Sequence, residues 1–201
     1  MPLRRGVRHD LGLAREAIAE GRRVVRQLLD LARSEETKAE YVDIHDFLSH
    51  GTKILSTMVL GEIGLKIVVE PEIGGVMIAP GQLTQVLMNL VINARDAMPN
   101  GGTIKIVATN AAAQHRRFQT HLQPEIAISV IDDGSGIPVE VQAHLFEPFF
   151  TTKAQQGGSG LGLATVYSIV RKNGGHIEVQ SNVGSGTRFD VFLPRSQRPE
   201  T

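Results

Sequence analysis

Residues 82–98 read QLTQVLMNLVINARDAM. Their apolar positions recur three and four residues apart, which is typical of one buried face of an α-helix. These positions are Leu83, Val86, Leu87, Leu90, Val91, Ala94 and Ala97. The following PNGG at 99–102 predicts the end of the helix. We therefore expect one long, half-buried helix near the middle of the chain.

Polar residues form a second face on this helix. Asn89, Asn93 and Asp96 stand at positions i, i+4 and i+7, so their side chains line up beside the apolar face. Two carboxamides and a carboxylate in a row can hold a hydrated Mg²⁺ and the phosphates it carries. A solvated helix edge is the alternative, and this helix alone does not decide between the two.

Strand-like and helical segments surround this helix. Asp43 is a candidate N-cap for a helix over 44–58, and a further helix is expected at 161–172. Alternating apolar residues predict strands at 65–70, 76–79, 104–108, 126–130, 177–179 and 189–193. This order predicts an α+β fold, a two-layer α/β sandwich with one mixed sheet covered on one face by helices.

A strand that ends in two carboxylates and two glycines is the second chemical motif. Residues 128–138 read ISVIDDGSGIP. Asp132 at the end of a buried strand can accept hydrogen bonds from an exocyclic amine, and Gly134 and Gly136 let a flat ring approach the backbone. Taken alone, the motif favours an ordinary Asp-Gly turn. Asp132 and Asp133 should point to opposite faces, which argues against a glycosidase pair.

A glycine-rich stretch before the last helix is the third motif. Residues 157–163 read GGSGLGL, and closely spaced glycines at a helix start expose backbone N–H groups to a phosphate. The pattern is weak alone, and it is neither a P-loop nor a dinucleotide fingerprint. Just before it, Lys153 in FFTTK at 149–153 is a point charge for a terminal phosphate, or else an ordinary surface lysine.

Composition excludes several classes of protein. Lys+Arg and Asp+Glu both number 21, so the net charge is zero and we expect no nucleic acid and no membrane contact. The chain has no Cys, which excludes disulfides, a thiol nucleophile and Cys-type zinc sites and fits a cytoplasmic, reducing compartment. The histidines show no paired metal spacing.

The N-terminal part carries a narrow apolar stripe within residues 11–32, formed by Leu11, Ala14, Ile18, Gly21, Val25, Leu28 and Ala32. It predicts a polar N-terminal helix whose stripe has little to pack on in its own chain. The stripe favours a homodimer through residues 11–32, but half a four-helix bundle is a small interface. A solvated terminal helix is the alternative, and the oligomeric state stays open.

The order of these motifs is more specific than any one of them. The Asn-bearing helix is followed by DDGSG at 132–136, FEPF at 146–149, GSGLGL at 158–163 and GSGTRF at 184–189. This series resembles the ATP-binding catalytic domain of sensor histidine kinases, in the superfamily of gyrase, Hsp90 and MutL ATPases. The resemblance runs from about Asp43 to Pro194. NARDAM at 93–98 and FFTTK at 149–153 resemble most the nitrogen- and oxygen-sensing kinases.

The resemblance implies the cofactors ATP and Mg²⁺. Asn93 would be the principal Mg²⁺ ligand, and Asn89 would support it and belong to the catalytic set. Asp96 would lie in the cofactor site. Lys153 would reach the terminal phosphate as a second catalytic residue. The phosphates would be cradled, at the mouth of a lid over 151–157, by Gly158, Gly160, Leu161 and Gly162.

The resemblance also implies a base pocket. Asp132 would accept the adenine amino group, Gly134 and Gly136 would shape the pocket, and Thr187 would close it. The family transfers the γ-phosphoryl group of ATP to a histidine and then to an aspartate, so we expect a two-component phosphorelay. The implied partners are a response regulator receiver domain and an acceptor-histidine dimerisation hairpin.

The chain departs from a whole kinase at its start. His9-Asp10 matches only the opening of the acceptor signature, and residues 25–33 resemble the end of the second hairpin helix. We expect residues 1–40 to be a hairpin remnant with a linker, 41–195 the catalytic domain and 196–201 a tail. The accepting histidine would then lie outside this chain, through truncation or natural loss.

Two other functions stay open. One is a nucleotide-binding regulatory module without kinase activity. The other is a slow ATPase of the gyrase or Hsp90 kind. The second is disfavoured because those relatives place a Glu where this chain has Asn89.

Overall fold

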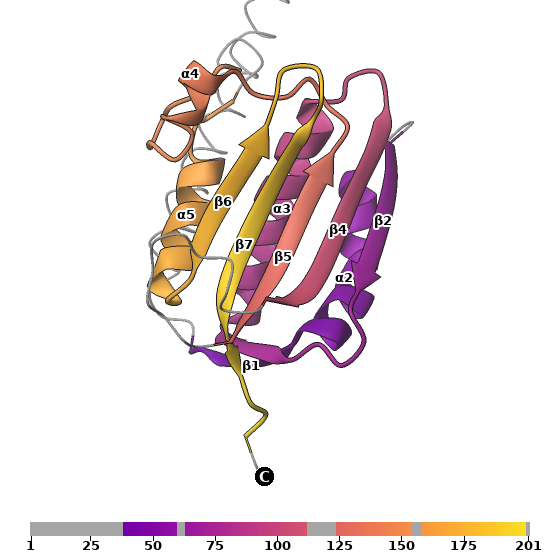
Figure 1. Ribbon diagram of the computed structural model, residues 1–201, viewed down its shortest axis with the longest axis vertical. Coiled ribbons are helices and arrows are strands. Elements are labelled where there is room, and N and C mark those ends of the chain that lie inside the picture. Colours follow the sequence, from indigo (N-terminus) through magenta and orange to yellow (C-terminus); the bar gives the residue numbers. More distant parts are fainter. Residues whose placement is uncertain (1–37, 60–62, 112–123, 154–157, 200–201) are drawn as a thin grey trace, which may run out of the picture.

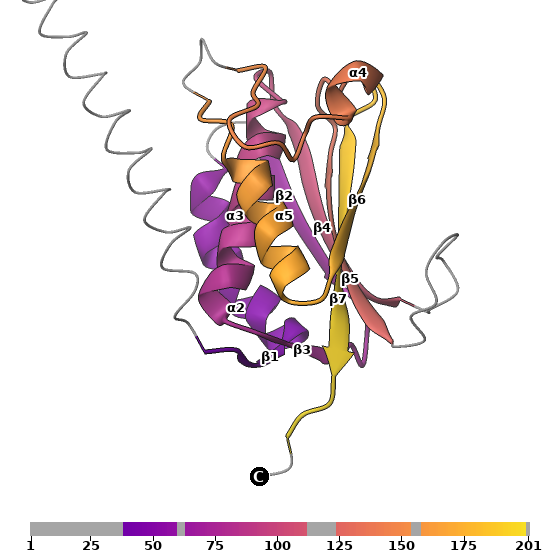
Figure 2. The same cartoon turned by 90° about the vertical axis from the view of Figure 1, so that its left-hand side faces the viewer.

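The computed structural model describes residues 38–59, 63–111, 124–153 and 158–199. One sheet carries its long helices on a single face (Figure 1, Figure 2). In chain order the elements are β1 (Glu40–Asp43), α2 (Ile44–Met58), β2 (Ile63–Val69), β3 (Gly75–Ile78), α3 (Pro80–Asp96), β4 (Gly102–Ala111), β5 (Glu125–Asp132), α4 (Val139–Gln142), α5 (Gly162–Lys172), β6 (His176–Ser181) and β7 (Thr187–Ser196). The predicted two-layer α+β fold is confirmed.

The sheet is mixed, as predicted. Its strand order is β1-β3-β7-β5-β4-β2, and β6 also pairs with β7. β2 and β4 run parallel, while every other pair in the described sheet is antiparallel. β3 pairs with the last residues of β7, where Gly75 lies opposite Ser196.

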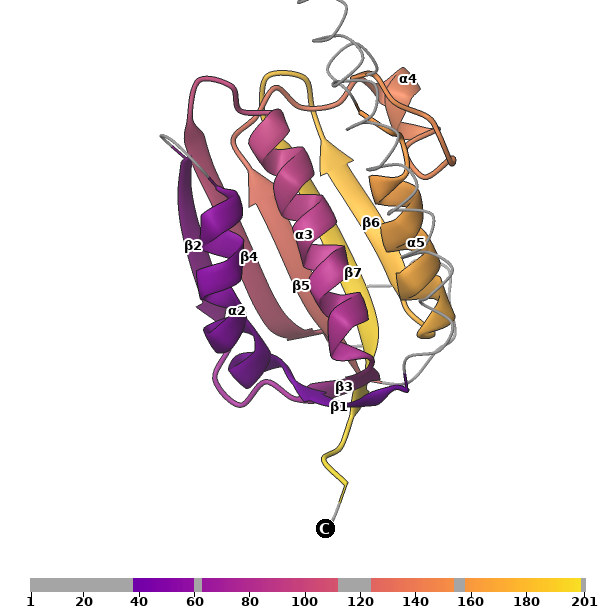
Figure 3. The same ribbon diagram turned by 180° about the vertical axis from the view of Figure 1, so that it is seen from behind.

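The core lies between the sheet and the helices. Side chains of a strand alternate between its two faces, so every second residue of the central strands points toward the helices. Ile104 and Ile106 of β4 and Ile126 and Ile128 of β5 are fully buried on this side. α3 crosses them (Figure 3), and its Leu90 is also fully buried. This burial fixes α3 on the sheet, and with it the polar face of the helix.

The three longer helices, α2, α3 and α5, begin within two residues of the predicted positions. The carboxylate of Asp43 accepts a hydrogen bond of 3.1 Å from the backbone N–H of Asp46, so it caps α2 as expected. α3 starts at Pro80, slightly earlier than predicted, because proline fits the first turn of a helix. It ends at Asp96, directly before the Pro-Asn-Gly-Gly turn.

Three features differ from the sequence-based expectation. β1 was not predicted, because Val42 is its one buried residue and four residues show no alternation. α4 was not predicted either, since none of its four residues is buried. β7 continues to Ser196 because its end pairs with β3.

Several predictions fall outside the described residues. These are the N-terminal helix over 11–32, the acceptor remnant at His9 and residues 154–157 of the expected lid. Among the helices that the structure describes, none is both long and apolar enough to cross a membrane.

Candidate nucleotide-binding site

The polar face of α3 lies where the helix pattern predicts. Leu83, Leu87 and Leu90 are at most 1% exposed, whereas Asn89 and Asn93 are half-buried. The side-chain nitrogen of Asn93 is buried and has no hydrogen-bond partner among the described residues. A buried polar atom without a partner is costly in a folded protein, so this nitrogen marks a position where the described residues leave a hydrogen-bonding group unsatisfied.

Asp132 lies at the end of β5 and is 5% exposed. One of its oxygens, Oδ1, accepts hydrogen bonds from the backbone N–H of Gly134 (2.8 Å) and of Thr187 (3.2 Å). Burial raises the pKa of Asp132, and the charge of Asp133 adds to this, while the two backbone bonds and the charge of Lys153 oppose it. The carboxylate is therefore held firmly in a poorly hydrated place.

Asp133 turns away from Asp132, as the alternation of a strand predicts. Its Oδ2 accepts a hydrogen bond of 3.1 Å from the backbone N–H of Thr103. Asp133 is exposed, whereas Asp132 is buried. The two carboxylates therefore lie in different surroundings and do not form a pair.

A network that sequence reasoning missed connects the loop after β5 with the β6–β7 pair. The hydroxyl of Ser181 accepts from the N–H of Ile137 (2.9 Å) and donates to the carbonyl of Gly186 (2.9 Å). The side-chain nitrogen of Gln142 donates to the carbonyls of Ile137 (2.8 Å) and Ser181 (3.0 Å). Neither Ser181 nor Gln142 belongs to a recognisable sequence motif, so sequence reasoning does not find them.

The glycines after β5 are needed by the protein itself. A Cβ on Gly136, which has a φ of +70°, would lie 2.0 Å from the carbonyl oxygen of Asn182. A Cβ on Gly134 would lie 2.7 Å from the Cβ of Ala97. These contacts let the loop pack against α3 and the β6–β7 turn. They account for both glycines by the packing of the protein itself, whereas the sequence predicts a flat ring beside them.

The base of the expected lid is closed by hydrogen bonds that backbone N–H groups donate. The N–H of Gly158 donates to the carbonyl of Lys153 (3.0 Å), and the N–H of Lys153 donates to the hydroxyl of Thr151 (3.0 Å). The N–H of Phe149 donates to the carbonyl of Gly160 (3.0 Å). The two ends of the 151–158 segment are therefore held side by side.

Lys153 is half-buried beside two carboxylates of the site. Burial lowers its pKa, and the negative charges of Asp96 and Asp132 oppose this, while the charge of Arg95 adds to it. Asp96 also binds the guanidinium of Arg95 at 2.7 Å and 2.9 Å. The structure thus brings together three side chains that are far apart in the sequence, as the predicted site requires.

The start of α5 faces the polar side of α3. A Cβ placed on Gly162, the first residue of α5, would lie 3.6 Å from Oδ1 of Asn89. Leu161 precedes it, is buried, and gives α5 no side-chain cap. The first N–H groups of an uncapped helix attract anions.

The predicted residues gather at one end of the domain. Figure 3 shows the end of α3, the end of β5 and the start of α5 at the same end of the sandwich. These elements carry Asn93, Asp132 and Gly162. Thr187 begins β7 at this end, and its N–H holds Asp132.

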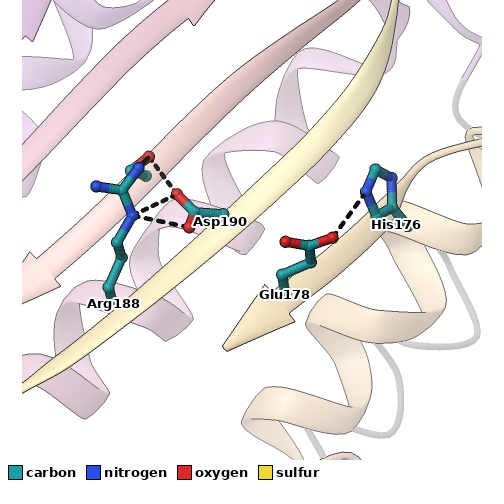
Figure 4. Close-up of polar contacts among 5 residues, drawn as sticks. His176, Glu178, Arg188 and Asp190 are labelled. Atoms are coloured by element: carbon teal, nitrogen blue, oxygen red, sulfur yellow. Dashed lines mark hydrogen bonds and ion pairs between the residues drawn. The ribbon is translucent and has the colours of Figure 1, made fainter. Parts of the chain in front are cut away.

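A second polar cluster lies on the face of the sheet opposite the helices (Figure 4). Arg188 binds both oxygens of Asp190 (2.8 Å and 2.9 Å) and donates to the hydroxyl of Ser129 (3.0 Å), which also binds Asp190. The carboxylate raises the pKa of Arg188. His176 stacks on Phe192 with ring centroids 4.3 Å apart. The cluster contributes no residue to the predicted site.

Comparison with known proteins agrees with the fold and the motif series. Residues 79–197 match the family of histidine kinase-, DNA gyrase B- and HSP90-like ATPases. Sensor kinase CckA of Brucella abortus (strain 2308) is 42% identical over 176 residues, which cover 86% of this chain and 19% of that protein. Sensor histidine kinase ZraS of Escherichia coli (strain K12) is 35% identical over 173 residues, 86% of this chain and 34% of that protein.

Solved structures share the fold. The catalytic domain of histidine kinase ThkA has a TM-score of 0.59 and 27% identity, covering 79% of this chain and 97% of that one. Full-length ShkA in complex with AMPPNP has a TM-score of 0.75 at 24% identity, covering 96% of this chain and 40% of that one. This chain spans about a fifth of CckA and a third of ZraS. The chain belongs to the family of histidine kinase-, DNA gyrase B- and HSP90-like ATPases, and its relatives include sensor histidine kinases.

Proposed function

We propose that this chain is the ATP-dependent catalytic core of a protein histidine kinase. The observation that carries the proposal is the hydrogen bonding of the buried Asp132 carboxylate. Its Oδ1 is occupied by two backbone N–H groups, and Oδ2 accepts no hydrogen bond from the part of the chain that the structure describes. A buried carboxylate with one oxygen left over is an acceptor for the exocyclic amine of adenine.

The residues present fit a bound Mg²⁺. Mg²⁺ takes oxygen ligands and keeps several waters, so one or two protein groups suffice. The side-chain nitrogen of Asn93 is buried and has no partner among the described residues, and a flip of the amide would place the side-chain oxygen at that position. Asn93 would hold the ion and Asn89 would support it. The ion, when bound, would offset the charge on the phosphate oxygens of ATP.

The phosphates would lie between the start of α5 and Lys153. The uncapped N–H groups that follow Leu161 and the glycines of 158–162 supply backbone donors. Lys153 supplies a positive charge beside Asp96 and Asp132. Binding, orientation and electrostatic stabilisation account for most of the catalysis in phosphoryl transfer, and these are the contributions this site can make.

The acceptor in this proposal is a histidine outside the printed residues 1–201, on a dimerisation hairpin. A response regulator receiver domain would take the phosphoryl group next, and residues 11–32 would contact a second copy. The relatives CckA and ZraS are named as sensor kinases, which supports this assignment. The proposed setting is cytoplasmic.

Calorimetric titration of the chain with ATP and Mg²⁺ tests the binding step. We expect uptake by the wild type and loss of uptake in Asp132→Ala. The Asn93→Ala variant should lose most of the Mg²⁺-dependent part of the affinity, because the ion loses its protein ligand. Its folded state should be no less stable, since the unpartnered amide is removed. Absence of uptake by the wild type would refute the proposal.

Phosphoryl transfer needs a separate assay. The chain is incubated with radiolabelled ATP, alone and with a supplied acceptor hairpin and receiver domain. We expect acid-labile label on the hairpin and none on this chain. Binding without transfer to any hairpin would favour the regulatory module. Rapid release of inorganic phosphate would favour the ATPase, against the expectation from Asn89.

A further inference from the structure

An apolar cavity lies at the end of the domain opposite the nucleotide site. Its volume is about 470 Å³, and it is surrounded by β1, α2 and the start of α3. Figure 3 shows β1 and the start of α3 at the end of the sandwich away from the end of β5. We call this cavity the β1–α2 groove and define it by its apolar lining, which is Tyr41, Phe47, Leu48, Leu55 and Leu87.

The edge of the β1–α2 groove is acidic. Glu40, Asp43 and Asp46 line it together with one arginine, Arg198, whose guanidinium lies 6.0 Å from the centre of the Tyr41 ring. Within the described ranges, no Lys, Arg or His forms an ion pair with Glu40 or Asp43. A segment that fills this groove should therefore be apolar on one side and basic at its margins.

The chain itself contains such a segment. Residues 24–33 read VVRQLLDLAR, and they lie outside the described residues. The stripe predicted over 11–32 uses Val25, Leu28 and Ala32. Val24 and Leu31 flank Leu28 at helical spacing and form a second, adjacent apolar stripe. Basic residues accompany it at Arg22, Arg23, Arg26 and Arg33.

The connection between this segment and the groove is short. Six residues, 34–39, join Arg33 to Glu40, which is itself part of the groove edge. An extended chain of that length spans up to about 20 Å. A short tether gives an effective concentration on the order of 1 mM, so even an intrinsic dissociation constant of about 0.1 mM leaves about nine chains in ten docked.

We propose that residues 24–33 of the same chain occupy the β1–α2 groove. Their second apolar stripe fills the groove, and their arginines lie beside the carboxylates of its edge. This placement narrows the proposed contact with a second copy from residues 11–32 to residues 11–22. The proposal does not depend on nucleotide binding, because the groove contains none of the residues of that site.

Disulfide trapping in the full chain tests this proposal, since the protein has no cysteine of its own. Leu28→Cys is combined with Thr84→Cys, because Thr84 is a half-buried residue of the groove. The matched control combines Leu28→Cys with Val183→Cys in the exposed β6–β7 turn, which Figure 1 shows at the far end of the domain. Mild oxidation should give an intrachain 28–84 disulfide about tenfold faster than the control pair.

Two results of the trapping experiment would overturn the proposal. Equal rates for the two pairs would show that the segment does not prefer the groove. A 28–84 disulfide found mainly in covalent dimers would place a second copy in the groove instead. Glu40→Gln with Asp43→Asn should slow the intrachain reaction at low salt, and Asn keeps the capping of α2 intact. An unchanged rate would refute the role of the acidic edge.

Tyrosine fluorescence provides a second test without cysteines. The chain has two tyrosines and no tryptophan, so Tyr167→Phe leaves Tyr41 in the groove as the one reporter. In this background, Leu28→Asp should increase quenching of Tyr41 by acrylamide, because the docked segment is displaced. Leu13→Asp, outside residues 24–33, should leave it unchanged. No difference between the two variants would contradict the proposal.

Discussion

The hydroxyl of Ser181 lies 2.9 Å from the hydroxyl of Thr187, the residue directly opposite it on β7. Ser181 gives its one proton to the carbonyl of Gly186, so Thr187 is the donor in this contact. The N–H of Thr187 in turn holds Asp132. Ser181 therefore supports the carboxylate of the candidate base pocket from behind, through the strand that carries Thr187.

Replacing Ser181 by alanine should weaken adenine nucleotide binding. The variant leaves the N–H of Ile137 and the hydroxyl of Thr187 without their partner, at about 1 kcal/mol for each lost bond. We expect the dissociation constant for ATP to rise about fivefold and Tm to fall by about 4–8 °C, since 1 kcal/mol corresponds to about 2–4 °C in a domain of this size. Calorimetric titration and thermal unfolding measure the two effects.

Two variants make the Ser181 experiment specific. Ser181→Thr keeps the hydroxyl and should restore most of the affinity. Ser185→Ala removes an exposed hydroxyl from the neighbouring turn and should change neither quantity. If Ser181→Ala binds ATP like the wild type, the supporting role is wrong.

Asp132→Asn should make the protein more stable near neutral pH. Burial raises the folded-state pKa of Asp132 above its unfolded value near 3.8. Its contribution to stability is therefore present below 3.8 and is lost as the pH rises through the raised pKa. Asparagine does not titrate and keeps the acceptor for both backbone N–H groups. Urea unfolding across this pH range should show that the free energy of unfolding of the variant rises relative to that of the wild type as pH increases.

The same substitution should weaken recognition of the base. The amide places an NH₂ group where the second carboxylate oxygen would accept the adenine amine, so affinity for ADP should fall about 10- to 100-fold. Asp133→Asn changes an exposed carboxylate next to it and should retain ADP binding. Equal losses of ADP affinity in both variants would show that the negative charge at this place matters, and not a specific contact with the base.

Lys153→Gln should weaken the binding of ATP more than the binding of ADP. If Lys153 reaches the terminal phosphate, removing its charge should reduce ATP affinity about tenfold, the loss of one charge-assisted hydrogen bond. ADP affinity should change far less. Lys105→Gln, an exposed lysine of β4, is the control and should alter neither. Calorimetric titrations give the affinities for both nucleotides. Equal losses of ATP and ADP affinity would show that Lys153 does not contact the terminal phosphate.

Arg188→Gln should destabilise the domain without changing nucleotide affinity. The variant leaves the carboxylate of Asp190, which is 3% exposed, with Ser129 as its remaining side-chain partner. The expected loss is about 1–2 kcal/mol, limited because the Arg188 side chain is 45% exposed. Arg171→Gln, an exposed arginine at the end of α5, should leave the free energy of unfolding unchanged. Urea titration compares them, and a change in ATP affinity would contradict the separation of the two sites.

The sequence was most informative where a long periodic pattern met a clear stop. α3 has seven apolar positions at helical spacing and a Pro-Asn-Gly-Gly turn after it, so its position and its polar face could both be predicted. β1 could not, since four residues with one buried side chain carry no period. Its position is set by pairing with β3, a contact between strands about 35 residues apart.

The candidate site shows the same division. Asn93, Asp132 and Gly162 stand in recognisable motifs, and the structure places their elements at one end of the sandwich. Ser181 could not be found, because a serine in a strand has no local signature and gains its role from the register with Thr187. The reason for Gly136 was also hidden, since its close neighbour Asn182 lies 46 residues further along the chain.

The pairing of Gly75 with Ser196 has a consequence for how the molecule is made. A chain emerging from the ribosome can wind α2 and α3 early, but β3 has to wait for the last strand before it gains its second neighbour. Contacts of such long sequence separation form slowly, because the intervening loop must first be closed. Until residue 196 is released, β1 and β3 form a two-stranded pair that β7 does not yet connect to the other strands of the sheet.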